Sequence, residues 1–148
     1  MKTKTFVILC LIMGLAATRL SAQSGKGQGN KTQVYDWPVP ANAIITEVIC
    51  DGVPVDVVTN AEPFLLQVVE HYKNGEVTSW NYHLNNIKFI SERTDEVFKY
   101  QGTERGSVKG GLDYTFGNMI GSLGNHYIMK LILDSNDWSV VDVSFSCH

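Results

Sequence analysis

Two carboxylates in the first strongly β-like part of the chain are the side chains best suited to chemistry. Asp51-Gly52 lies between the apolar runs 44–50 and 53–59, and such a dipeptide is a strong signal for a two-residue hairpin turn. With that turn, Glu47 faces Asp56 directly, and like charges that face one another across strands are destabilising. A bound cation, or a carboxyl pKa raised for the acid–base work of a hydrolase or isomerase, would offset the repulsion. A solvated outer face, or a register slip of one residue, would also explain the pair.

A cysteine and a histidine stand side by side at the end of the sequence, in VSFSCH. Neighbours in a strand point to opposite faces, so His148 is badly placed to act as a base for Cys147. Of the three cysteines, Cys10 lies within the predicted signal peptide. In an oxidising compartment, the remaining two cysteines of one small domain most simply form a disulfide. Cys50 shares a strand face with valines, and Cys147 shares one with Phe145 and Val143. We therefore predict a buried Cys50–Cys147 bridge that pins the last strand to the first hairpin.

A second hairpin is predicted around Asn74-Gly75, and it supplies the candidate ligand-binding residues. Alternation places Trp80 and Tyr82 on one face of this hairpin, and Tyr127 falls in a later strand-like segment. Two half-apolar faces suit either a packed core or the lining of an interior cavity. If a cavity forms, these three aromatic residues should line it.

The histidines do not predict a metal site. With Asn74-Gly75 as the turn, His71 and His83 lie on opposite faces and about 16 Å apart, at about 3.3 Å per residue along a strand. Zinc holds nitrogen ligands at about 2 Å, so we expect neither a metal nor a cofactor. The glycine-rich segment 101–126 has no Gly-Lys-Ser/Thr motif and is not a phosphate-binding loop. It predicts a long adaptable loop or β-bulges, with room for a short helix within 116–123.

The first 22 residues have the pattern of a signal peptide. Lys2 and Lys4 precede an apolar run at 6–17, which is shorter than the roughly 20 residues that span a bilayer. Ala22 offers a small residue for cleavage. Without residues 1–22, nine basic and fifteen acidic residues give a net charge of −6, which argues against nucleic acid and anionic membranes as partners. We expect a secreted or periplasmic protein.

The rest of the sequence predicts one domain. Residues 23–33 are rich in Gly, Ser, Lys and Asn and should form a disordered linker. Residues 34–148 contain strand-like segments separated by turns, which is typical of an all-β antiparallel meander of about eight strands. Such a sheet loses its free edges by closing into a barrel, the arrangement that we favour, or by folding into a β-sandwich.

Three segments resemble a group of small secreted bacterial β proteins: ICDGVPVDVVTN, VVEHYKNGEVTSWNYHLNNIKF and SERTDEVFKYQG, which lie between Ile49 and Gly102. A Cys-x-Gly strand, a strand ending in Asn-Gly and a histidine-containing strand carry the resemblance, whereas RTDEVFKY lacks the glycine of that group's next segment. The leader ending SAQ is similar to those of exported proteins from Bacteroidetes-type bacteria. The resemblance implies an exported β protein and no particular activity.

Three classes of function follow from these features. We expect a non-catalytic protein that binds a small or apolar ligand in its barrel, or that presents a surface to an extracellular protein or glycan. One alternative is a carboxylate-dependent hydrolase or isomerase that acts outside the cytoplasm, with Glu47 and Asp56 as its acid and base. The other is a structural or assembly protein of the cell envelope.

Overall fold

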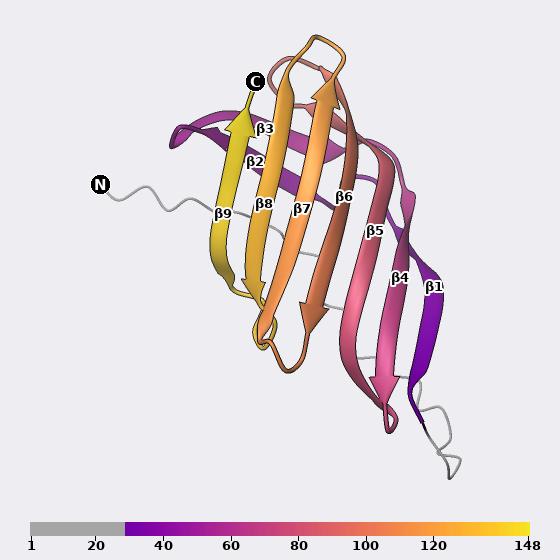
Figure 1. The fold of residues 1–148 in the computed structure, drawn as a ribbon. Coiled ribbons are helices and arrows are strands. Elements are labelled where there is room, and N and C mark those ends of the chain that lie inside the picture. The colour runs from indigo at the N-terminus through magenta and orange to yellow at the C-terminus, as the bar shows by residue number, and fades with distance from the viewer. Residues whose placement is uncertain (1–28) are drawn as a thin grey trace.

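The computed structural model describes residues 29–148, which form nine antiparallel strands (Figure 1). Hydrogen bonding joins seven of them in the order β1-β4-β5-β6-β7-β8-β9. The predicted signal peptide lies outside the described residues, and the sheet begins at Lys31, within the predicted linker. The strands are β1 (Lys31–Val39), β2 (Ile45–Cys50), β3 (Val53–Asn60), β4 (Phe64–Lys73), β5 (Glu76–Ser91), β6 (Val97–Ser107), β7 (Leu112–Gly121), β8 (His126–Asp134) and β9 (Val140–Cys147).

Strand β5 is long enough to hold two neighbours along one edge. Its first part pairs with β4 as far as His83, and its last part pairs with β3 from Phe89 onward. Between these parts the ladder to β6 is interrupted, and Asn86 has a φ of 55°, a left-handed conformation that asparagine tolerates. As a result, β3 and its partner β2 leave the main sheet and cross behind its upper part in the view of Figure 1.

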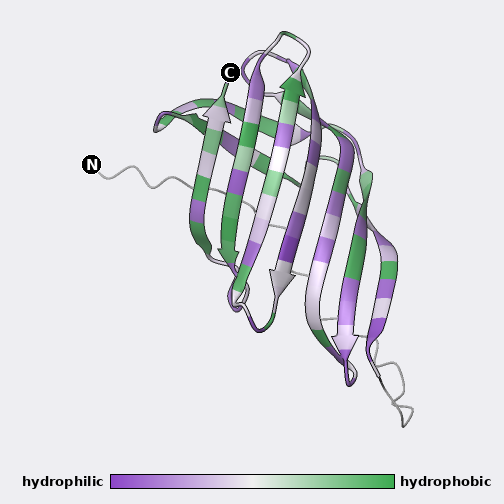
Figure 2. Ribbon diagram, viewed as in Figure 1, coloured by the Kyte–Doolittle hydropathy of each residue, from purple (hydrophilic) through white to green (hydrophobic). Residues whose placement is uncertain are grey.

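The β2–β3 hairpin covers part of one face of the sheet, which we call the inner face; the other is the outer face. Val48 and Val58 of the hairpin are fully buried in one cluster with Phe98, Met119 and Tyr127 of the sheet. Apolar and polar residues alternate along most strands, which produces the bands of colour in Figure 2. Because one set of alternate residues packs on the hairpin, the register of each strand decides which side chains face inward.

A disulfide, rather than a hydrogen-bonded ladder, joins the hairpin to the last strand. Cys50 at the end of β2 is bonded to Cys147 at the end of β9, with 5.9 Å between their Cα atoms, so the predicted bridge is confirmed. No ladder among the described strands closes the sheet, so the expected barrel is not confirmed. A hairpin layered on a larger sheet fits the sandwich alternative. Residues 29–148 contain no helix long and apolar enough to cross a membrane.

The glycine-rich segment forms the end of β6 and the whole of β7, not a long adaptable loop, and the short helix that we allowed within 116–123 is wrong. Glycines on its inner face leave room for aromatic rings. A Cβ atom on Gly106 would collide with the ring of Trp80, and one on Gly117 would collide with the ring of Tyr100. Glycine is therefore required here by side chains that lie flat across the sheet.

Candidate functional site

The structure separates the two carboxylates that the sequence placed together. A β-bulge next to Val48 shifts the β2–β3 register, so that Glu47 faces Val57 and Asp56 faces Val48. Asp56 is buried and accepts hydrogen bonds from the Ser91 hydroxyl and the Val57 amide, both at 2.8 Å. The prediction of a Glu47–Asp56 pair is wrong, because the bulge turns the two side chains to opposite faces.

A different carboxyl pair lies on the inner face, near the end of β6 and the start of β7; this end of the sheet is remote from the β2–β3 hairpin (Figure 1). Glu104 on β6 faces Thr115 on β7, and Asp113 on β7 faces Gly106 on β6, so the acids are diagonal neighbours. The exposed fraction is 4% for Glu104 and 0% for Asp113. Two acids are thus withdrawn from water side by side, which is a feature of functional sites more often than of packed cores.

Two neighbouring side chains donate hydrogen bonds to this pair. The Trp80 indole N–H donates to Asp113 Oδ2 (2.6 Å), and the Thr115 hydroxyl donates to Glu104 Oε2 (3.3 Å). The indole reaches from β5 to β7 because Gly106 on the intervening strand has no side chain. The other oxygen, Asp113 Oδ1, is buried without a hydrogen-bond partner among the described residues. A buried acceptor left in this state costs about 1–3 kcal/mol, and more when it is charged.

Burial and mutual repulsion make the pair hold a proton near neutral pH. Burial, followed by the negative charge of Asp113, raises the pKa of Glu104 to about 8. Burial also raises the pKa of Asp113, and hydrogen bonds from the Trp80 indole and from protonated Glu104 partly oppose that change. The ion pairs of residues 29–148 are Lys88–Glu62 and Lys130–Asp142, so no cation in the described part of the chain compensates the acids.

Aromatic rings surround the acids. Tyr82 faces Glu104 across β5 and β6, and burial, followed by that carboxylate, raises the pKa of its phenol. The ring of Trp138 lies 5.9 Å from the ring of Trp80, between their centroids. We call Trp80, Tyr82, Glu104, Asp113 and Thr115 the inner acid site.

The structure brings together two of the three predicted aromatic residues. Trp80 and Tyr82 belong to the inner acid site, whereas Tyr127 stacks on Phe98 in the core, 5.2 Å between ring centroids, beside the end of β9. The sequence interpretation missed Glu104 and Asp113, which lie in the glycine-rich segment. Alternation around Gly106 would have placed both acids on one face if that segment had been recognised as two strands.

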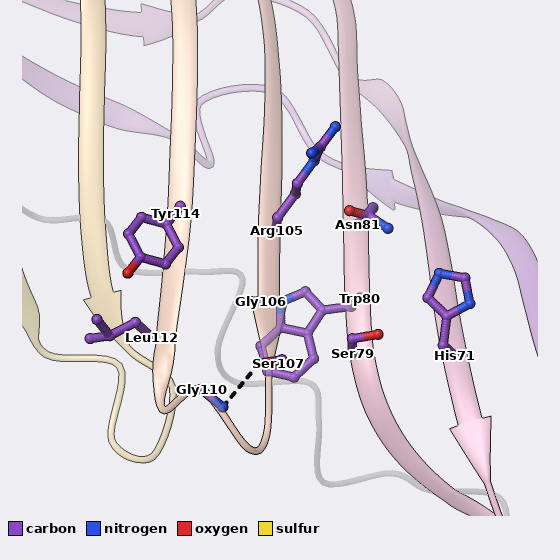
Figure 3. Close-up of a pocket in the computed structure, with 10 residues that line it drawn as sticks. All are labelled: His71, Ser79, Trp80, Asn81, Arg105, Gly106, Ser107, Gly110, Leu112 and Tyr114. Atoms are coloured by element: carbon purple, nitrogen blue, oxygen red, sulfur yellow. Dashed lines mark hydrogen bonds between the residues drawn. The ribbon is translucent and has the colours of Figure 1, made fainter.

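The outer face of the same strands carries a polar groove of about 360 Å³ (Figure 3). Leu112 and Gly110 line its end near the β6–β7 turn. Trp80 and Gly106 also line it, although their side-chain positions face the inner side of the sheet. We call this the outer groove. Two adjacent rows across the sheet form it: His71, Ser79 and Ser107 in one row, and Asn81, Arg105 and Tyr114 in the other.

The predicted placement of the histidines on opposite faces is wrong. A second bulge, between His71 and Tyr72, puts His71 opposite Ser79 and His83 opposite Gln67, so both histidines lie on the outer face. They are about 13 Å apart at about 3.3 Å per residue. His71 Nδ1 is 3.1 Å from the Thr32 hydroxyl of β1. Residues 29–148 contain no group of three or more side chains that could hold a metal ion.

The fold and the two sites define a disulfide-bonded all-β domain with a buried acid pair on one face and a polar groove on the other. Comparisons with models of protein families, with curated proteins and with solved structures found no match for this chain. The similarity to small exported bacterial β proteins stays a prediction. Functional inference therefore rests on the chemistry of the two sites.

Proposed function

We propose that the protein is an exported, non-catalytic binding protein whose inner acid site takes a small ligand with an ammonium group and an apolar body. Two observations carry the proposal: the acid pair has no cation, and Asp113 Oδ1 is buried with no donor other than the proton that the two acids share. Export is supported by the predicted signal peptide and by the Cys50–Cys147 disulfide, since disulfides persist in oxidising compartments.

An ammonium group supplies both the hydrogen-bond donor and the positive charge that the acid pair lacks. It has three N–H donors, so it can donate to Asp113 Oδ1 and to Glu104 while its charge neutralises theirs. The rings of Trp80 and Tyr82 add cation–π attraction, which is worth about 0.5–2 kcal/mol depending on burial. A neutral alcohol could satisfy the oxygen but would leave the charge uncompensated, so the site should prefer the cation.

We expect the ligand to reach the acids from the side of β1 and β4. Tyr35 of the edge strand β1 is exposed, and Glu70, which faces Trp80, is half-buried on the inner face. Burial, followed by the Glu70 carboxylate, raises the pKa of Tyr35 to about 12. A further acid at the rim favours the approach of a cation over that of an anion.

Binding should release a proton, because the ammonium replaces the proton that the acid pair holds in the free protein. Glu104 has a pKa of about 8, so it must lose its proton to bind the cation as a carboxylate. The affinity should therefore rise as the pH rises toward 8, by up to about tenfold per pH unit for one released proton. Above pH 8 the affinity should level off.

The test is a calorimetric titration of the disulfide-bonded protein at pH 6, 7 and 8.5 with hexylammonium, hexyltrimethylammonium and 1-hexanol. We expect hexylammonium to bind at least about tenfold tighter than hexanol, with an affinity that increases with pH. The quaternary ion should be intermediate, because it carries the charge but no N–H donor. Equal binding of hexanol and hexylammonium at every pH would contradict the proposal.

Two matched variants test whether the preference for the cation arises at the inner acid site. Asp113→Asn removes the charge and should abolish the preference for the cation, whereas Asp142→Asn removes an equal charge from the Lys130–Asp142 pair on β9 and should not. Unfolding midpoints of both variants establish that they are folded. Native mass spectrometry of the protein from its own host should show a carried amine.

Acid–base catalysis at the same pair is the second candidate function. A pKa of about 8 for Glu104 lies close to the range in which a carboxyl group transfers protons efficiently near neutral pH. Incubation of the carried ligand with the protein distinguishes the two functions. A catalyst converts the ligand to a product of different mass or stereochemistry and loses that turnover in Glu104→Gln, while a binding protein returns the ligand unchanged.

A further inference from the structure

We propose that the outer groove binds an acidic sugar residue of a glycan, with Arg105 on its carboxylate and Tyr114 against its ring. This groove lies on the opposite face of the sheet from the inner acid site, although Trp80 belongs to both, and its ligand carries the opposite charge. Arg105 lies on β6 between Asn81 and Tyr114, and its side chain extends from the strand to the upper edge of the lining residues drawn in Figure 3.

Among the residues that the structure describes, Arg105 has no acidic neighbour on its own face of the sheet. It takes part in neither of the ion pairs of residues 29–148. The acids nearest to it along the chain and across the ladders, Glu104 and Asp113, project from the inner face. The guanidinium therefore keeps its planar fork of donors, which matches a carboxylate in two-point geometry. Its neighbours on the outer face all lack a carboxylate: Asn81, Tyr114, Thr103, Ser107, Ser79 and His83.

The other lining residues match the rest of a sugar. Asn81, Ser79 and Ser107 present an amide and two hydroxyl groups in the two adjacent rows, and such groups donate to and accept from sugar hydroxyls. The side chain of Tyr114 is 39% exposed, and Phe116, two residues further along the same face, is 51% exposed. An exposed aromatic ring offers an apolar surface for the C–H groups of a sugar ring.

The dimensions favour one or two sugar residues. Asn81, Arg105 and Tyr114 stand opposite one another on β5, β6 and β7, and strands are about 4.8 Å apart, so this row extends about 10 Å. The volume of about 360 Å³ is at the small end of ligand sites. A phosphate or sulfate group would be met more favourably by several cations or by a cluster of backbone N–H groups, and the groove has one arginine.

The test is a titration of the disulfide-bonded protein, followed by NMR, with methyl β-glucuronide, methyl β-glucoside, acetate and inorganic phosphate. The glucuronide should bind at least about tenfold tighter than the glucoside or acetate. A neutral sugar that binds equally well would overturn the role of Arg105. Acetate or phosphate that binds as tightly as the glucuronide would overturn recognition of a sugar.

Two variants that each remove one positive charge from β6 distinguish binding by Arg105 from general electrostatic attraction. Arg105→Gln should lower the affinity for the glucuronide to that for the glucoside, a loss of about tenfold or more. Lys99→Gln removes an equal charge from the same face of β6 away from the groove, and it should change the affinity by less than about twofold. Equal losses in the two variants would mean general electrostatic attraction and would overturn the site.

Discussion

Replacement of Glu104 by glutamine should change how the stability of the protein depends on pH. The pKa of Glu104 is raised from an ordinary value of 4.5 to about 8, first by burial and then by Asp113. Between these two pH values the folded protein holds a proton that the unfolded chain has lost. The stabilising contribution of Glu104 is therefore fully present below about pH 4.5 and is lost as the pH rises through about 8.

The expected effect is large compared with the stability of a small domain. One proton held only by the folded state changes the unfolding free energy by up to about 1.4 kcal/mol per pH unit. Over the interval set by the two pKa values of Glu104, the wild-type protein should lose on the order of 4 kcal/mol. Domains of this kind unfold with about 5–15 kcal/mol. Glutamine at position 104 has no proton to lose. Over the same pH interval, the unfolding free energy of Glu104→Gln relative to wild type should therefore rise by a similar amount.

The assay is urea-induced unfolding, followed by tryptophan fluorescence, of wild-type and variant proteins with an intact disulfide at pH 5, 7 and 9. Glu47→Gln is the control, because Glu47 lies on the opposite face of its strand from the buried residue Val48. The difference in unfolding free energy between Glu47→Gln and wild type should be the same at each pH. If the difference between Glu104→Gln and wild type also stayed constant within about 1 kcal/mol, the acid pair would not hold a proton and the reasoning would fail.

Two further predictions concern the packing and the crosslink of the sheet. Gly106→Ala places a Cβ atom in the ring of Trp80 and should destabilise the protein by about 1–3 kcal/mol, as overpacking does. It should also shift the tryptophan emission, whereas Gly29→Ala, with open space around it, should do neither. Replacement of Cys50 and Cys147 by serine should cost about 2–5 kcal/mol, measured by urea unfolding. Intact mass after alkylation without reductant should show no free thiol, and two alkylated cysteines would disprove the bridge.

The turns of the two hairpins could be predicted because they depend on local chemistry. Asp51-Gly52 and Asn74-Gly75 have positive φ at both positions, between 52° and 87°, as a two-residue hairpin turn of this kind requires. Cys50, directly before the first turn, faces Val53, directly after it, as a two-residue turn requires. The conformation of a turn and the pairing directly beside it can therefore be predicted from the sequence.

The register beyond each bulge could not be predicted, because no residue type marks a bulge. The register shifts next to Val48 and His71 allow whole strand faces to pack against the core. That packing depends on residues that are distant in the sequence. A slip of one residue moves every later side chain to the other face. The predicted Glu47–Asp56 pair was lost for this reason.

Strand β7 escaped prediction for a different reason. Glycine is depleted in strands because it adds entropy to the unfolded chain and offers no side chain to pack, so the segment around Gly106 and Gly117 predicted a loop. Here the absence of side chains on β6 and β7 is what lets Trp80 and Tyr100 lie flat across the sheet. The partners that justify these glycines lie on other strands, which a local pattern does not include.

The bulge between His71 and Tyr72 determines which side chains reach the inner acid site and which reach the outer groove. In an unbulged hairpin, Trp80 would share a face with His71, so that either the indole would leave the acid pair or the histidine would enter the core. With the bulge, Trp80 faces Glu70 on the inner side and His71 faces Ser79 on the outer side. Strict alternation then continues along β6 from Glu104 to Arg105, so neighbouring residues of opposite charge face opposite sides of one sheet. Each charge is thereby separated from the partner that would neutralise it within the chain, and this separation leaves both sites able to recognise a charged ligand.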